Sequence, residues 1–130
     1  MECVADTSAI LAVIMGEAQK DAILSVTKGV TVIGPASIVW EIGNAFSAMI
    51  KRKRINLAQA HKGIGVFHQI PIRYIEVDFT NALTLSAEFN IYAYDAYFLD
   101  CCLRKAAPLL TLDIKQQDIA KKLGIDIMEV

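Results

Sequence analysis

The chain has little of what marks several large classes of protein. Its 130 residues include only three cysteines, Cys3, Cys101 and Cys102, and no CxxC pair. An odd count with two adjacent members favours neither a disulfide framework nor a zinc site. We therefore expect the protein to work in a reducing compartment, the cytoplasm.

Long apolar runs and a strong charge of either sign are also missing. No apolar run reaches the roughly 18 residues that a membrane span requires, and no basic signal-peptide segment opens the chain, so we expect no membrane association. The formal net charge is -1, so nucleic acid binding would need a local basic patch. The GxxxxGK[ST] loop is absent, which argues against a nucleoside triphosphatase.

What the chain has in abundance is apolar residues, which make up 55% of it. β-Branched runs bounded by Gly or Pro alternate with runs of helical periodicity. This alternation predicts one α/β domain over residues 1–130, a three-layer α/β/α sandwich around a mostly parallel, five-stranded sheet. The expected strands are 2–6, 30–33, 73–77, 109–112 and 125–130, and the expected helices are 8–15, 17–28, 38–54, 56–69, from 78 or 80 to 89, 95–106 and 113–124.

Four acidic residues fall at matching places in this pattern. Asp6 ends the first strand, Asp113 follows the fourth, Asp95 opens a helix and Glu41 lies one turn into another. Because the carboxyl ends of parallel strands meet at one edge of a sheet, we expect the four to gather there. Crowded carboxylates raise one another's pKa, and a divalent cation relieves that conflict. Hard oxygen ligands select Mg²⁺ or Mn²⁺ over zinc.

Each acid also has a purely structural explanation. Asp6, Asp95 and Asp113 stand where a residue caps a helix, and an early Glu41 suits the helix dipole. Asp100 lies on a different helix face from Asp95, so we expect it to pair with Arg104 at i+4. We expect His61 and His68 to be surface or partly buried residues rather than ligands.

The acidic constellation predicts a metal-dependent phosphodiester hydrolase. Bound metal would orient a phosphate and activate a water, leaving a 5′ phosphate and a 3′ hydroxyl. The one dense basic run, Lys51-Arg52-Lys53-Arg54, is either the cationic end of a helix or a contact for phosphate or a partner. The aromatic residues near the acids are Trp40, Tyr92, Tyr94, Tyr97 and Phe98. We expect most of them in the core or in a dimer interface, and Tyr92 or Tyr94 is a candidate for stacking on a base.

Four segments in order resemble the PIN domain, and more narrowly the VapC toxins of VapBC toxin–antitoxin modules. They are Val4-Ala5-Asp6-Thr7-Ser8-Ala9, Glu41-Ile42-Gly43-Asn44, Tyr94-Asp95-Ala96-Tyr97-Phe98-Leu99 and Thr111-Leu112-Asp113. The resemblance covers nearly the whole chain. One departure is Ile114-Lys115-Gln116-Gln117, which lacks the aromatic that often follows the last acid.

The resemblance implies a Mg²⁺- or Mn²⁺-dependent ribonuclease with a parallel sheet flanked by helices. Asp6, Glu41, Asp95 and Asp113 would be its catalytic and metal-binding quartet, and Thr7, Ser8, Asn44 and Thr111 would support it. It also implies a homodimer, or a larger assembly, silenced by a VapB-like antitoxin that covers the active-site groove.

Two other classes stay open at this point. A receiver-type signalling domain also holds Mg²⁺ in an acidic pocket, but it needs an acidic neighbour beside the first acid and a late lysine, which this chain lacks. A binding module with the PIN fold and no chemistry would need no acids, whereas all four are present.

Overall fold

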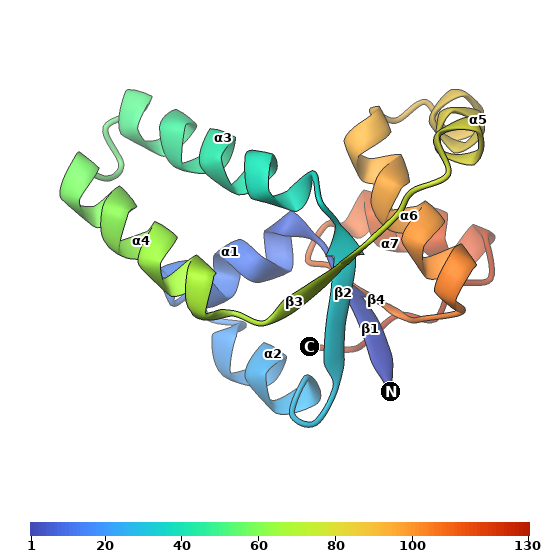
Figure 1. The fold of residues 1–130 in the computed structure, drawn as a ribbon, viewed down its shortest axis with the longest axis horizontal. Helices are drawn as coiled ribbons and strands as arrows, with labels where there is room; N and C mark the ends of the chain where they lie inside the picture. The colour runs from blue at the N-terminus through green and yellow to red at the C-terminus, as the bar shows by residue number, and fades with distance from the viewer.

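The computed structural model describes all 130 residues as alternating strands and helices (Figure 1). The strands are β1 (Glu2–Ala5), β2 (Thr31–Pro35), β3 (Ile72–Ile75) and β4 (Leu109–Leu110). The helices are α1 (Thr7–Met15), α2 (Lys20–Val26), α3 (Ile38–Lys51), α4 (Leu57–Gln69), α5 (Phe79–Phe89), α6 (Ala93–Lys105) and α7 (Ile114–Lys122).

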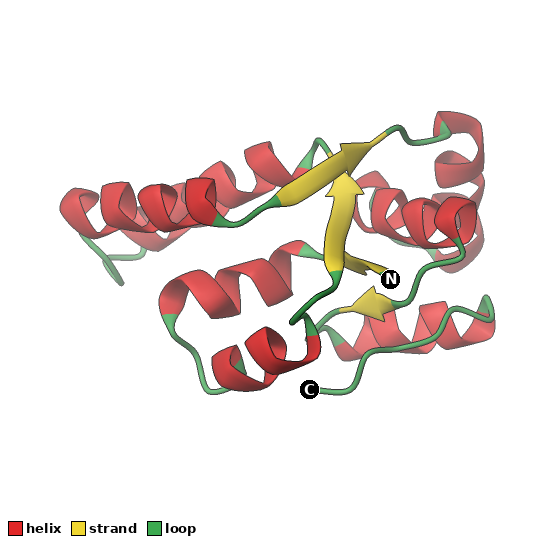
Figure 2. Cartoon of the chain, turned by 60° about the horizontal axis from the view of Figure 1, so that its bottom comes forward, coloured by secondary structure: helices red, strands yellow, loops and turns green.

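The four strands form one parallel sheet in the order β3-β2-β1-β4. Cys3, Val4 and Ala5 of β1 are almost completely buried, as expected for a central parallel strand covered on both faces. Helices α1 to α4 lie on one side of the sheet and α5 to α7 on the other (Figures 1 and 2). The predicted α/β class and its parallel sheet are therefore confirmed. None of the helices combines the length and apolar character that crossing a bilayer requires.

The predicted fifth strand, residues 125–130, is wrong. The segment forms only an isolated bridge, in which Ile127 pairs with Leu109. The backbone N–H of Leu109 donates to Asp126 O at 2.8 Å, and that of Met128 donates to Leu109 O at 2.9 Å. Because β4 has only two residues, it offers the last segment too short a ladder to form a strand.

Helix ends follow the capping residues in the sequence. Asp6, Asp78 and Asp113 each occupy an N-cap and accept a hydrogen bond from the first turn, and Asn56 forms a complete capping box with Gln59. The two differences that matter for the site are that α3 ends at Lys51 instead of 54 and α6 begins at Ala93 instead of 95.

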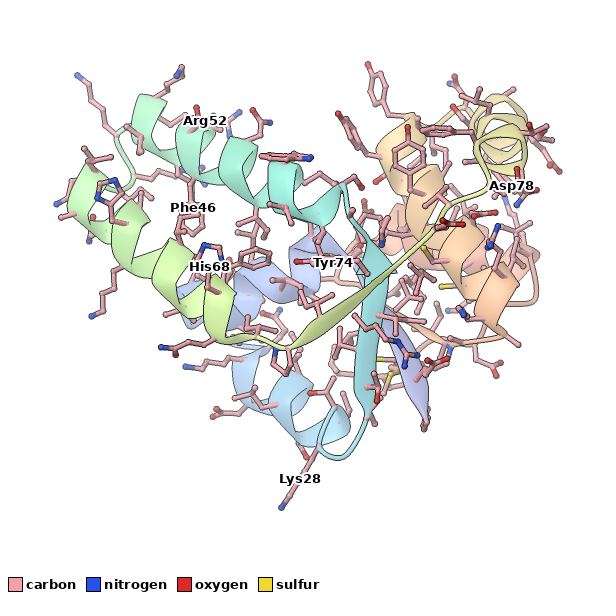
Figure 3. The ribbon with its side chains drawn as sticks, viewed as in Figure 1. Lys28, Phe46, Arg52, His68, Tyr74 and Asp78 are labelled. Atoms are coloured by element: carbon pink, nitrogen blue, oxygen red, sulfur yellow. The ribbon has the colours of Figure 1, made fainter.

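Close packing of α4 fixes the position of α3, the helix that carries Glu41. Gly63 of α4 faces Phe46, and a Cβ at position 63 would lie 2.5 Å from Phe46 Cζ. Figure 3 shows Phe46 pointing from α3 toward α4. Any side chain at 63 would therefore force the Phe46 ring to move.

Candidate active site

Asp6 is the buried centre of the site, at 7% exposure. As the N-cap of α1 it accepts hydrogen bonds at Oδ1 from Ser8 Oγ at 2.6 Å and from the backbone N–H of Ala9 at 3.2 Å. The hydroxyl of Thr111, beyond β4, donates to Oδ2. Burial nevertheless raises the pKa of Asp6 above its ordinary value, and the neighbouring Asp113 raises it further.

Ser8 and Thr111 join the ends of β1 and β4. The backbone N–H of Leu112 donates to Ser8 Oγ at 3.0 Å, and that of Asp113 donates to Thr111 Oγ1 at 3.0 Å. Asp113 is exposed and accepts at Oδ1 from the N–H of Lys115 at 2.9 Å as the N-cap of α7. The two hydroxyls therefore fix Asp113 relative to Asp6.

Glu41 reaches the same place from the first turn of α3 and is half-buried. Burial raises its pKa to about 7, and Asp95 and Asp6 add to that increase. Hydroxyls of Ser37 and Thr7 act in the opposite direction, and Ser37 Oγ donates to Glu41 Oε2 at 3.2 Å. The Thr7 Oγ1 atom is buried and makes no hydrogen bond of acceptable geometry, so it lowers the pKa of Glu41 through its proximity alone.

Asp95 lies in the first turn of α6 and is half-buried. The N-cap position belongs to Tyr92, so Asp95 does not cap the helix and its carboxylate remains available. Burial raises its pKa, Asp113 raises it further and Lys115 lowers it. The carboxamide of Gln116 on α7 donates to the Asp95 carbonyl oxygen at 2.9 Å, which holds the two helices together.

The four predicted acids are thus brought together at the carboxyl edge of the sheet. Electrostatic repulsion links Asp6 to Asp113, Asp113 to Asp95, and Glu41 to both Asp95 and Asp6. None of them forms an ion pair, since the one ion pair in the structure joins Arg73 to Glu2.

The donor set suits a hard divalent cation: four carboxylates with surplus negative charge, and a buried Thr7 hydroxyl without a hydrogen-bond partner. However, no group of three or more His, Cys, Asp or Glu side chains is arranged to hold one ion. The carboxylates are neighbours rather than a preformed coordination shell.

A family model of the PIN domain matches residues 3–122. The chain belongs to the PIN domain family. PIN domains are generally nucleases, and they generally use divalent metal ions. A comparison of sequences with curated proteins finds no match.

Solved structures share the fold of this PIN domain. The protein PAE2754 of Pyrobaculum aerophilum has a TM-score of 0.71 and 18% identity, covering 92% of this chain and 79% of its own. VapBC2 of Rickettsia felis, bound to a DNA fragment from its promoter, has a TM-score of 0.66 and 15% identity over 98% of both chains. A toxin–antitoxin complex of Klebsiella pneumoniae has a TM-score of 0.62 and 16% identity, over 98% of this chain and 99% of its own.

The other predicted residues of the PIN domain have different surroundings. Asn44 is exposed and lines a cleft of about 310 Å³ together with Glu41 and Thr7. The basic run 51–54 is exposed at the far end of α3. His61 and His68 are exposed on α4, as expected.

One prediction about a side chain near the site is wrong, and another is narrowed. Asp100 does not pair with Arg104; it is fully buried and accepts hydrogen bonds from the N–H of Asp78 at 2.9 Å and from Asn81 Nδ2 at 2.7 Å. The reason is that α6 turns this position inward against α5. Trp40, expected in the core or in a dimer interface, lies outside the core with 76% of it exposed, so its place in a dimer interface stays a prediction.

Sequence reasoning missed two residues that support the acids. Ser37 lies four residues before Glu41, a helical spacing that signals the contact. Gln116 gives no such signal, because its partner Asp95 lies on another helix and is contacted through its backbone.

Proposed function

We propose that this protein, a single PIN domain over residues 1–130, is a Mg²⁺- or Mn²⁺-dependent endoribonuclease and the VapC-type toxin of a type II toxin–antitoxin system. The observation that carries the proposal is the crowding of Asp6, Glu41, Asp95 and Asp113, none of which forms an ion pair. Such an arrangement destabilises the protein unless it serves to bind a cation.

In this proposal the four acids would hold the metal ion beside one phosphodiester. When bound, the ion would neutralise charge at the phosphate and lower the pKa of the attacking water. Ser8 and Thr111 orient the Asp6 oxygens, so that Asp6 presents a fixed ligand. Glu41, whose pKa is raised to about 7 without metal, would have to lose its proton in order to hold the ion. The products are a 5′ phosphate and a 3′ hydroxyl.

The fold shared with the Rickettsia and Klebsiella complexes supports a VapB-like antitoxin as partner. The proposal also includes a homodimer or larger assembly and a place in the cytoplasm. An apolar groove of about 490 Å³ lies beside the edge strand β3 and includes Tyr74 and Phe79, which are 44% and 66% exposed. Figure 3 shows Tyr74 on β3. Exposed apolar surface of this kind is typical of a protein interface.

The receiver-type alternative does not fit the topology. Receiver domains have the strand order 2-1-3-4-5, whereas here the order is β3-β2-β1-β4. A PIN-fold module without chemistry differs from the proposal only in activity, so the experiment below separates the two.

The test is cleavage of single-stranded and structured RNA by the purified protein. We expect cutting with Mg²⁺ or Mn²⁺ and none with EDTA. Asp6→Asn and Asp95→Asn should each lower the rate at least 100-fold, because each removes a charged metal ligand. Asp118→Asn, an exposed acid on α7, is the matched control and should cut normally. Cutting that persists in EDTA, or in a folded Asp6→Asn variant, contradicts the proposal.

A further inference from the structure

We infer that the exposed face of α3 is a track for single-stranded RNA, with a base stacked on Trp40 and a phosphate bound at Lys51. The inference rests on the proposed function, because it assigns a substrate surface to the same site. It accounts for two features that the acids leave unexplained, namely an exposed tryptophan and the basic end of α3.

Trp40 borders the acidic site. It directly precedes Glu41, is 76% exposed, and lines the cleft of about 310 Å³ that also contains Glu41 and Thr7. Tyr94, from α6, lines the same cleft and directly precedes Asp95; it is 54% exposed. Both aromatic rings therefore line the cleft that contains Glu41, and a base adjacent to the scissile phosphate would have a ring within reach.

Other aromatic residues keep Tyr94 in place. Its ring contacts Tyr97 edge-on, at 5.8 Å between centroids and 89°, and Tyr97 in turn contacts Phe79 at 5.8 Å. A ring held by such contacts loses little conformational freedom when a base stacks on it. The cleft thus has a supported wall on α6 and the exposed indole on α3.

From Trp40 a polar stripe runs along α3. Asn44, Ser47 and Lys51 follow it at intervals of four, three and four residues, which places all of them within an arc of about 60° over a length of about 16 Å. Lys51 Nζ donates to Ser47 Oγ at 3.3 Å. The apolar residues Ile38, Ile42 and Phe46 are buried on the other face of α3.

The chemistry of the stripe favours a nucleic acid strand over a protein. An aromatic ring can stack on a base, an amide and a hydroxyl can contact a sugar, and an amine can bind a phosphate. Sites for single strands combine stacking with cations in this way. A net charge of -1 and four carboxylates repel RNA, so the affinity has to come from outside the acids. Trp40 and Lys51, with Arg52 beside it, supply stacking and positive charge along one line.

Trp40 is also the only tryptophan, so its fluorescence reports on this surface alone. The Asp6→Asn variant is titrated in Mg²⁺ with a short single-stranded RNA. This variant is used because the proposed function predicts that it does not cut the RNA. An abasic strand of the same length and charge is the control ligand. Stacking predicts that the RNA quenches the fluorescence at saturation and that the abasic strand binds at least tenfold more weakly with little quenching.

Variants divide the track into its parts. Trp40→Ala should raise the Kd for RNA about tenfold, as expected for the loss of one base stack, and Trp40→Phe should restore part of that loss. Lys51→Ala should lower the salt dependence of log Kd by about 0.7, the value for one phosphate contact in a single strand. Leu57→Ala, an exposed apolar residue at the start of α4, should leave both unchanged.

The outcomes are distinguishable. Unchanged RNA affinity in folded Trp40→Ala overturns the inference, and a change of oligomeric state in that variant would assign the surface to a protein interface instead. If the fluorescence is quenched and the affinities fall as predicted, but the unmodified protein does not cut RNA, the RNA track is retained and the nuclease proposal is refuted. Cutting with equal affinity for RNA and the abasic strand would retain the nuclease and refute the track.

Discussion

Asp100 and Asp6 are both buried aspartates, at 0% and 7% exposure, but their surroundings differ in kind. Both oxygens of Asp100 accept from α5, one from the N–H of Asp78 and one from the Asn81 amide (Figure 3 labels Asp78). Asp6 also accepts hydrogen bonds, yet its pKa stays raised, because it is buried and lies beside Asp113. Donors make Asp100 a structural residue, whereas neighbouring acids make Asp6 a candidate ligand.

The largest expected effect is a difference in the free energy of unfolding between substitutions at Asp100 and at Asp6. Asp100→Ala should lower the free energy of unfolding by about 2 kcal/mol, since it removes a fully buried acceptor and leaves two partly buried donors without a partner. Asp6→Asn should change it by less than about 1 kcal/mol, because the amide oxygen still accepts from Ser8 and Ala9, the Thr111 hydroxyl can turn to accept from the amide N–H, and a repulsive charge is lost. Urea denaturation measures both, with Asp118→Ala as an exposed control. Equal losses at positions 6 and 100 would remove the distinction.

A second prediction concerns pH. Asp6, Glu41 and Asp95 all have raised pKa values, so the folded protein binds more protons than the unfolded chain. In EDTA the stabilisation from protonated Glu41 should be present below pH 4.5 and disappear as the pH rises to about 7. Mg²⁺ should act in the opposite direction and raise Tm more at pH 8 than at pH 5, because it binds the deprotonated carboxylates.

Glu41→Gln is the control for this pH dependence. It should flatten the decline of Tm between pH 5 and 7 in EDTA and reduce the effect of Mg²⁺ at pH 8. If wild type and Glu41→Gln have the same profile, the acids do not carry the stability difference that we assign to them.

The smallest expected effect comes from Ser37. Its hydroxyl lowers the pKa of Glu41 through a bond of 3.2 Å, so Ser37→Ala should raise that pKa further. We expect the acidic limb of the cleavage profile to move to higher pH and the rate at pH 6 to fall about twofold, consistent with the loss of one partly exposed hydrogen bond. Ser25→Ala on α2 is the control, and an unmoved limb would show that Glu41 does not titrate in the reaction.

The gathering of the acids at one edge of the sheet could largely be predicted from sequence, because the carboxyl ends of parallel strands lie at the same edge. Asp6 follows β1 directly and Asp113 comes three residues after β4, and the sheet brings them together without any detail of side-chain packing. Glu41 and Asp95 were predicted on helices that begin at the same edge, and the structure places them there. Their assignment as metal ligands stays a proposal.

Features that depend on packing between elements could not be predicted. Asp100 had a plausible partner at i+4 in Arg104, but the burial of one face of α6 against α5 overrode that local signal. The last segment has the β-branched composition of a strand, but β4 is too short to pair with more than Ile127. The exposure of Trp40 depends on which face of α3 packs against α4, and that is set by the contact between Gly63 and Phe46.

The central claim is that Asp6, Glu41, Asp95 and Asp113 together bind metal at one centre. The most direct test is a crystal structure grown with Mn²⁺ and measured at a wavelength where manganese scatters anomalously. We predict an anomalous peak bound by oxygens of Asp6 and of at least two of the other three acids. A fully occupied Mn²⁺ elsewhere on the protein, with these four carboxylates unliganded, would contradict the account.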